Sequence, residues 1–153
     1  MRIRPLRELA ALRYDRKQAR GLTIKSEAAH RLKEINGDAL ELTVVFKAPA
    51  AKECGVDVLC DPNGENGLRI AVLTESDTLR VGNVNAPFKL KHGEDLTLRI
   101  FIDKNLVEVF ANDRQAAAAA QKYAPETLGV SQFSKGGATL VKDIRSWKMK
   151  SIY

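Results

Sequence analysis

The chain has 153 residues, 44% of them hydrophobic, and a formal net charge of +6 at pH 7. A chain of this length and composition is large enough for one globular domain with its own core, which excludes a disordered protein. No segment approaches the about 18 consecutive apolar residues of a membrane span, so we expect no membrane partner.

The positive charge is concentrated at the N-terminus. Residues 1–33 contain ten Lys and Arg and three acidic residues, a net charge of +7, whereas residues 34–153 have a net charge of −1. The basic residues are not interleaved with aromatic residues and no nucleic-acid-binding motif is present, so we expect no nucleic-acid partner. Residues 1–20 are predicted to be a linker-like basic segment, solvated or facing a partner domain, ahead of a single domain over residues 21–153.

The first residues also bear on location. They contain no apolar stretch of the kind found in a signal peptide, which favours a cytoplasmic protein. Met1 leads directly into the linker-like sequence RIRPLREL. We therefore expect either a piece whose start was lost or a free-standing domain.

Residues 26–35 are open to two interpretations. Ser26 is a suitable N-cap for a helix with Ala29, Leu32 and Ile35 on one face. Alternatively, residues 21–25 and 30–35 are strands, and Asn36 begins a turn. We favour the strands, because helix propensity over ten residues is a weak indicator.

The middle of the chain predicts a series of short strands. Residues 40–46 alternate strictly between core-type residues and Glu41, Thr43 and Val45, which is typical of a strand. The further elements expected here are strands at 55–60, 68–74 and 78–81, a turn at 61–66, and a stretch over 83–94 that is mostly loop.

The two cysteines, Cys54 and Cys60, flank one of these strands. An extended strand separates them by about 20 Å, which is beyond disulfide reach. Neither has a histidine or a second cysteine pair at zinc spacing, so we expect no metal and no cofactor. We predict two reduced, half-buried thiols.

The clearest element is a hairpin over residues 96–111. Leu96, Leu98, Ile100 and Ile102 alternate with polar or outward residues, a turn follows at 103–105, and a second strand spans 106–111. Asn112 and Asp113 form the next turn, since both tolerate positive φ.

The remaining sequence completes an all-β fold. Alanines 116–120 favour a helix by propensity. We nevertheless predict a strand, because the run leaves a turn directly after a strand. Strands at 128–133 and 139–149 follow, joined through Gly136 and Gly137. Many short strands with regular turns predict a two-sheet antiparallel β-sandwich.

The central hairpin, IDKNLVEVFANDRQA, resembles the signature hairpin in the C-terminal β-sandwich of glycoside hydrolase family 32, the invertases, levanases and inulinases. Three further fragments resemble the family in the same order: RPLRELAALR, GDALELTVVF and GVSQFSKGGATLVKDIRSWKMKSIY. The resemblance implies a sandwich of the jelly-roll or concanavalin-like kind, a fructan or sucrose context, and a catalytic propeller domain as a partner.

Two fragments also resemble the family's catalytic motifs. Asp61 begins Asp-Pro-Asn-Gly, similar to the nucleophile motif, and Glu53 precedes Cys54 as in the acid/base motif. Retaining hydrolysis requires two carboxyl groups about 5–5.5 Å apart, whereas one strand separates these two. The family's Arg-Asp-Pro element is absent. We therefore interpret Asp61 as a turn former and expect no catalytic residue.

Five polar residues gather on the central hairpin: Asp103, Glu108, Asn112, Asp113 and Arg114. Carboxylates and a guanidinium can bind sugar hydroxyls through charge-assisted hydrogen bonds, and the resemblance implies related modules that bind terminal fructose. The alternative is that these residues are turn formers and a cross-strand ion pair. Trp147 is a sixth candidate, suited to stacking on a sugar or to packing.

The sequence therefore leads to three hypotheses. The first is a non-catalytic C-terminal sandwich with a structural or interaction role. The second is a carbohydrate-binding module for fructosyl ends of levan, inulin or sucrose, and the third is a β-fructofuranosidase in its own right. We also expect a two-fold homodimer, because a sandwich without its propeller exposes an apolar patch and unpaired strand edges.

Overall fold

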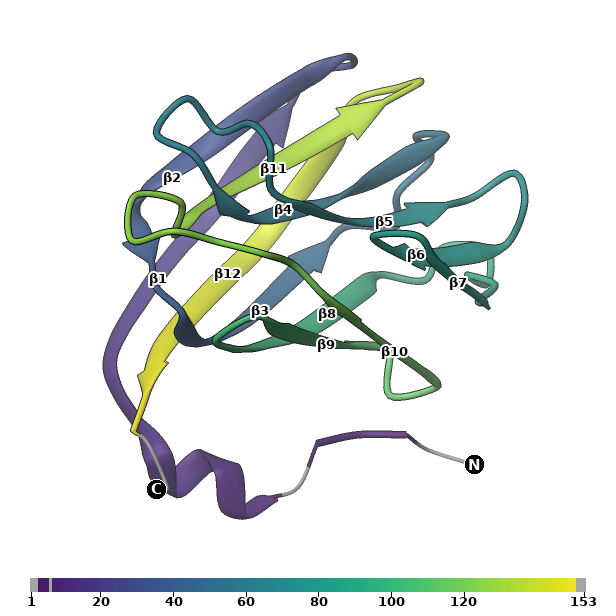
Figure 1. Cartoon of the computed structure of the whole chain (residues 1–153). Coiled ribbons are helices and arrows are strands. Elements are labelled where there is room, and N and C mark those ends of the chain that lie inside the picture. Colours follow the sequence, from purple (N-terminus) through teal and green to yellow (C-terminus); the bar gives the residue numbers. More distant parts are fainter. Residues whose placement is uncertain (1–2, 6, 151–153) are drawn as a thin grey trace.

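The computed structural model describes residues 3–5 and 7–150, which form a sandwich of two antiparallel sheets (Figure 1). A short 3₁₀ helix, η1 (Arg7–Leu12), precedes the strands. The strands are β1 (Arg13–Ile24), β2 (Ala28–Asn36), β3 (Ala39–Phe46), β4 (Glu53–Cys60), β5 (Leu68–Leu73), β6 (Thr78–Val81), β7 (Val84–Pro87), β8 (Leu96–Asp103), β9 (Leu106–Ala111), β10 (Gln115–Ala120), β11 (Gly129–Lys135) and β12 (Thr139–Met149).

Each sheet contains six strands. Sheet A has the order β1-β12-β3-β8-β9-β10, and sheet B has the order β2-β11-β4-β5-β6-β7. The first two strands of the domain lie in different sheets, β1 in sheet A and β2 in sheet B. The last two do as well, with β11 in sheet B and β12 in sheet A. The predicted two-sheet antiparallel sandwich is confirmed.

The core lies between the sheets and follows the alternation in the sequence. In β8, Leu96, Leu98 and Ile100 are fully buried, and they belong to one core cluster with inward side chains of β4 and β5. Sheets that pack face to face bury alternate residues of each strand in this way. The outward residues of sheet A, such as Phe101, are therefore left for other contacts.

Both ambiguous segments are strands. Residues 28–36 form β2 and pair with β11, so the helical alternative is excluded. The alanine run forms β10, with Ala116 opposite Phe110 and Ala120 opposite Leu106. Pairing along the edge of a sheet outweighs the helix propensity of alanine, because each residue of β10 finds a partner on β9.

Strand β1 begins at Arg13, within the segment expected to be a linker. It pairs with β12 over its whole length, and Arg20 lies opposite Asp143. The register shifts between Tyr14 and Lys17, where Asp15 has a φ of 51°. This bulge interrupts the period of two and explains why the strand is not visible as alternation in the sequence.

The expected loop over residues 83–94 contains one additional strand, β7. It pairs with β6 across a tight turn at Gly82, which has a φ of 60°. Pro87 ends the strand, a position where its missing N–H costs no ladder hydrogen bond because β7 is the edge of sheet B. The rest of this stretch is loop, as predicted.

The two cysteines are free and fully buried, so the prediction of half-buried thiols was wrong. The reason is the position of β4, a central strand of sheet B whose two faces are both covered. Burial raises the pKa of the Cys54 thiol and of the Cys60 thiol to about 12.

Candidate functional site

The six candidate residues do not meet in one place. Asp103 lies opposite Leu106 at the turn of the β8–β9 hairpin, and Asn112 follows the opposite end of β9. These ends are about 17 Å apart, since a strand rises about 3.4 Å per residue. Trp147 lies on β12, which β3 separates from β8.

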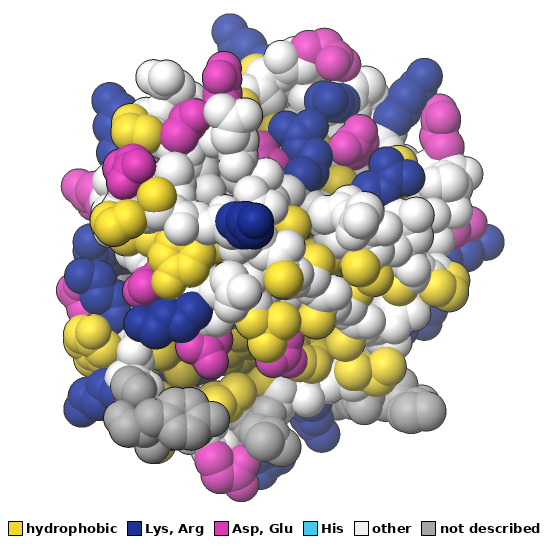
Figure 2. All heavy atoms as spheres, viewed as in Figure 1, with side chains coloured by type: hydrophobic (Ala, Val, Ile, Leu, Met, Phe, Trp, Pro, Cys, Tyr) yellow, Lys and Arg dark blue, Asp and Glu magenta, His cyan; other side chains and the backbone are white. Residues whose placement is uncertain are grey.

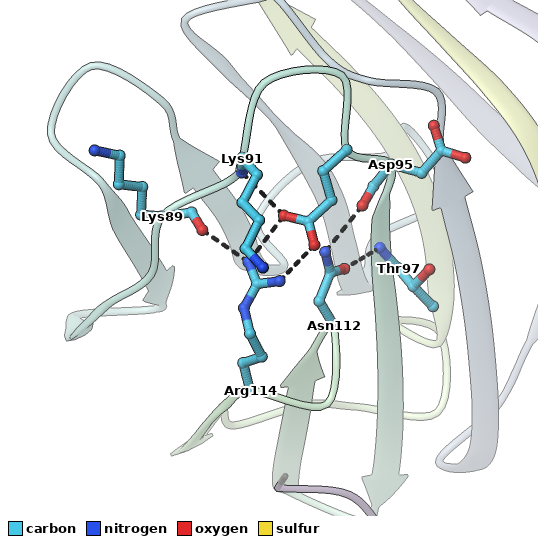
Figure 3. Close-up of polar contacts among 7 residues, drawn as sticks. Lys89, Lys91, Asp95, Thr97, Asn112 and Arg114 are labelled. Carbon is cyan, nitrogen blue, oxygen red and sulfur yellow. Dashed lines mark hydrogen bonds and ion pairs between the residues drawn. The ribbon is translucent and has the colours of Figure 1, made fainter. Parts of the chain in front are cut away.

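Arg114 holds the loop that precedes β8 (Figure 3). Its guanidinium donates to both carboxylate oxygens of Glu94, one of them at 2.9 Å, and to the carbonyl of Lys89 at 2.7 Å. The Lys91 amide donates to the same carboxylate at 2.9 Å. The hydrogen bonds from Arg114 lower the pKa of Glu94 to about 2. This two-pronged, charge-assisted pair fixes the loop to the end of the hairpin.

Asn112 extends the same network. Its side-chain oxygen accepts from the Thr97 amide at 2.6 Å, and its amide nitrogen donates to the Asp95 carbonyl at 2.9 Å. The Asp95 carboxylate accepts from the Ala48 amide at 2.9 Å and from Lys142 at 2.8 Å. The bond from Lys142 lowers the pKa of Asp95. Two loops are thus tied together at one end of the sandwich.

A cavity of about 330 Å³ lies between these two loops, and we call it the end cavity. Its lining comes from the loop over residues 48–50, the loop over residues 88–94, and the end of β5 with the turn that follows it. Its apolar residues are Ala48, Pro49, Ala50, Val72, Phe88 and Leu90, and the other lining residues are Thr74, Asp77, Lys91, His92, Gly93 and Glu94. Sequence reasoning missed this cavity because three separate segments without a shared motif supply its residues.

A second hollow of about 460 Å³ lies on the outer face of sheet A, and we call it the sheet-A hollow. Figure 2 shows hydrophobic side chains gathered in the lower half of this view, where the surface is hollowed. Phe101 and Phe110 pack edge to face on the sheet side, with ring centroids 6.0 Å apart. Opposite them lie Pro5, Leu9 and Leu12 of the N-terminal segment.

Two of the predicted site residues, Asp103 and Glu108, line the sheet-A hollow. The N-terminal segment is anchored beside them, because the Ile3 amide donates to the carbonyl of Asp113 at 2.6 Å. At the other side, the Lys150 amide donates to the Leu12 carbonyl at 2.9 Å. The hollow therefore combines aromatic and aliphatic walls with charged side chains.

Trp147 is covered rather than open to a ligand. The Arg13 guanidinium lies 4.1 Å from the centroid of its ring. The same guanidinium donates two hydrogen bonds to the Glu41 carboxylate, with nitrogen–oxygen distances of 2.9 and 2.6 Å. Only 9% of Trp147 is exposed, and Glu41 is fully buried although it lies on the outer face. This arrangement matches the packing role rather than sugar stacking.

The two carboxyl groups that resemble catalytic residues lie at opposite ends of β4. Eight residues of extended chain place Glu53 and Asp61 about 26 Å apart, far more than retaining hydrolysis allows. Asp61 accepts hydrogen bonds from the amides of Asn63 and Glu65, both at 2.9 Å, and these backbone bonds lower its pKa. Asp61 is thus a turn former, as expected.

Among residues 3–5 and 7–150, no group of three His, Cys, Asp or Glu side chains is arranged to hold a metal ion. No helix within these residues has the length and hydrophobicity needed to cross a membrane.

Comparison with known proteins identifies the domain. Residues 8–148 match the family described as "Glycosyl hydrolases family 32 C terminal". The chain is 28% identical over 166 residues to the levanase of Bacillus subtilis strain 168, covering 97% of this chain and 24% of the levanase. It thus spans about a quarter of that relative.

Solved structures show the same fold. Fructan 1-exohydrolase IIa from Cichorium intybus superposes with a TM-score of 0.80 at 13% identity, over 96% of this chain and 37% of the exohydrolase. The carbohydrate binding module CBM66 from Bacillus subtilis superposes with a TM-score of 0.54 at 12% identity, over 82% of this chain and 84% of the module. At these identities the likeness concerns the fold alone. The family match covers most of the chain, which therefore belongs to the C-terminal domain family of glycosyl hydrolases family 32.

Proposed function

We propose that this chain acts as a non-catalytic β-sandwich that docks against the catalytic propeller domain of a family 32 protein. The observation that carries the proposal is the sheet-A hollow. An outer sheet face in contact with water normally carries polar side chains, whereas here Phe101 and Phe110 form an apolar wall. A partner domain would remove this surface from water.

The separation of the carboxyl groups supports a role without catalysis. Glu53 and Asp61 cannot act on one glycosidic bond from opposite ends of a strand. The isolated chain is expected to release no reducing sugar from sucrose, inulin or levan. Sugar release that falls in Asp61→Asn or Glu53→Gln would instead support an enzyme in its own right.

The docking face can be tested in a hybrid protein. In the Bacillus subtilis levanase, this chain would replace the segment that it matches. We expect one cooperative thermal transition, because the two domains stabilise each other. Phe101→Asp should separate this into two transitions, and the Tm of the isolated sandwich with the same change measures the local cost of removing the contact with Phe110.

Val84→Asp is the control for a carboxylate placed on another sheet, since Val84 is an exposed hydrophobic residue on β7 of sheet B, whereas Phe101 is half-buried. If Phe101→Asp and Val84→Asp behave alike in the hybrid, the outer face of sheet A is not the docking face.

A second candidate function is binding of fructosyl chain ends. It is supported by the similarity to the carbohydrate binding module CBM66, which extends over most of both chains. Calorimetric titration with levan and inulin oligosaccharides tests it. Binding heat with fructans and none with maltotriose is expected, and an absence of heat with every fructan would rule the function out.

A further inference from the structure

We propose that the end cavity is the site that binds a fructosyl end, with Asp77, Lys91 and His92 contacting the sugar hydroxyls. This inference rests on the carbohydrate-binding function proposed above and assigns the contacts with the sugar to residues other than the six predicted from the sequence. Four properties of the cavity support it: rigidity, size, an apolar wall and three polar side chains available to a ligand.

The cavity is built on fixed loops. On one side, Glu94 is held by Arg114, as described above. On the other, the Thr74 hydroxyl donates to the carbonyl of Ala51 at 2.8 Å. The Phe88 amide donates to the carbonyl of Asp77 at 2.9 Å, which joins the β5–β6 turn to the loop that leads into β8. A ligand would therefore enter a site that needs little ordering on binding.

Size and wall chemistry favour a small, partly apolar ligand. At about 330 Å³ the cavity is at the lower end of the range of small-molecule sites, about 300–1,000 Å³. Its wall includes Pro49, Leu90 and the buried Phe88. Such a wall suits the C–H face of a sugar ring, and the volume suits a chain end of one or two rings.

The polar side chains at the cavity divide into two groups. Thr74 and Glu94 are already committed to hydrogen bonds within the domain. By contrast, the side chains of Asp77, Lys91 and His92 make no hydrogen bond or ion pair with another described residue.

These three groups differ in hydrogen-bonding character. A carboxylate only accepts, an ammonium only donates, and a neutral imidazole does both. Sugar hydroxyls donate and accept as well, so a polyol can pair with all three at once. The opposite charges of Asp77 and Lys91 also leave no strong net charge at the cavity, which favours a neutral ligand over a charged one.

The roles of the residues follow from this donor and acceptor character. Asp77 would accept from two hydroxyls through charge-assisted bonds, and His92 and Lys91 would donate to ring or hydroxyl oxygens. Arg114 and Asn112 act as positioning residues, because they hold the loop that carries Lys91 and His92. This gives the hairpin residues a part in the site without direct contact with the sugar.

The test is calorimetric titration of the whole chain with levan oligosaccharides, using maltotriose as the control sugar. We expect Asp77→Asn and His92→Ala to weaken binding about tenfold or more, since each removes a hydrogen bond to the ligand. Asp77 has a φ of 49°, which asparagine tolerates, so the turn should be retained. Glu75→Gln is the matched control, because Glu75 is an exposed carboxylate two residues away that does not line the cavity.

A measurement on the unaltered protein guards against misfolded variants. In NMR titration, amide shifts should concentrate in the loops over residues 48–50 and 88–94. If fructans bind but Asp77→Asn, His92→Ala and these amides are unaffected, the site is elsewhere and the inference is wrong while the binding function stands. If Glu108→Gln alone weakens binding, the sheet-A hollow is the site instead. If the unaltered chain binds no fructan, the carbohydrate-binding function and this site fail together.

Discussion

The guanidinium of Arg114 donates two hydrogen bonds to the carboxylate of Glu94, which lies 20 residues earlier in the chain. The pair ties the loop over residues 88–94 to the end of β9, although neither partner lies opposite the other in a strand ladder. It replaces the ion pair within the hairpin that the sequence had suggested for Arg114.

Arg114→Ala should loosen this loop and lower the free energy of unfolding by about 1–3 kcal/mol, because a partly buried carboxylate loses its main partner. Urea denaturation followed by circular dichroism measures the loss. Arg99→Ala is the control, since Arg99 is a half-buried outward residue of β8. A loss equal to that of the control would show that the pair contributes nothing beyond an ordinary surface contact.

The same pair predicts a dependence of stability on pH. Glu94 has a pKa of about 2 in the folded protein, below its ordinary value of 4.5. A carboxylate whose pKa is depressed on folding stabilises the protein above its unfolded pKa and loses this effect as pH falls towards the folded pKa. Between about pH 5 and pH 2, the unfolding free energy of Glu94→Gln should therefore fall less steeply than that of the unaltered protein. Equal slopes would contradict the shift.

Gly55 is required by the close approach of β5. A Cβ atom at this position would lie 1.9 Å from the carbonyl oxygen of Ile70, so the two strands would have to move apart. Gly55→Ala should lower the unfolding free energy by at least about 2 kcal/mol. Gly64→Ala, which meets open space but has a φ of 79°, should cost only about 1 kcal/mol. Thermal or urea denaturation measures both losses. A larger loss for Gly64→Ala than for Gly55→Ala would show that the close approach of β5 does not require a glycine at position 55.

Cys54 and Cys60 should both be present as thiols that react slowly in the folded protein. Both are buried, and burial raises the pKa of each to about 12, so little thiolate exists at pH 8. Titration with a thiol reagent should count two thiols after denaturation without reductant. A fast-reacting thiol in the native protein would show that β4 opens readily.

The predicted homodimer can be checked by light scattering coupled to size exclusion. Of the four edge strands, β1 and β2 carry much of the N-terminal positive charge, which opposes pairing with a second copy. We therefore expect two copies to associate through the outer face of sheet A, and Phe101→Asp to give a monomer. A monomer mass for the unaltered chain at tens of micromolar would rule the dimer out.

Sequence periodicity predicted most strands because their inward residues alternate strictly, as in Leu96, Leu98 and Ile100. It did not reveal the start of β1, where the bulge at Asp15 breaks the period. It also did not identify the partner of Arg114, since Glu94 lies in a loop and no spacing rule relates the two. The end cavity was invisible for the same reason, because tertiary contacts alone bring Asp77 and His92 to one place.

The strand order determines when each strand can pair as the chain folds during synthesis. Strand β12 separates β1 from β3, and β11 separates β2 from β4, so the first two strands can join their sheets only through the last two. As the nascent chain leaves the ribosome, β2 can pair only once β11 has emerged, up to residue 135, and β1 only once β12 has emerged, up to residue 149. Closing such long loops slows folding. Their high density of lysine and arginine keeps these waiting strands soluble and discourages pairing with neighbouring chains. Within this domain, the first strands to be made are thus the last to be incorporated.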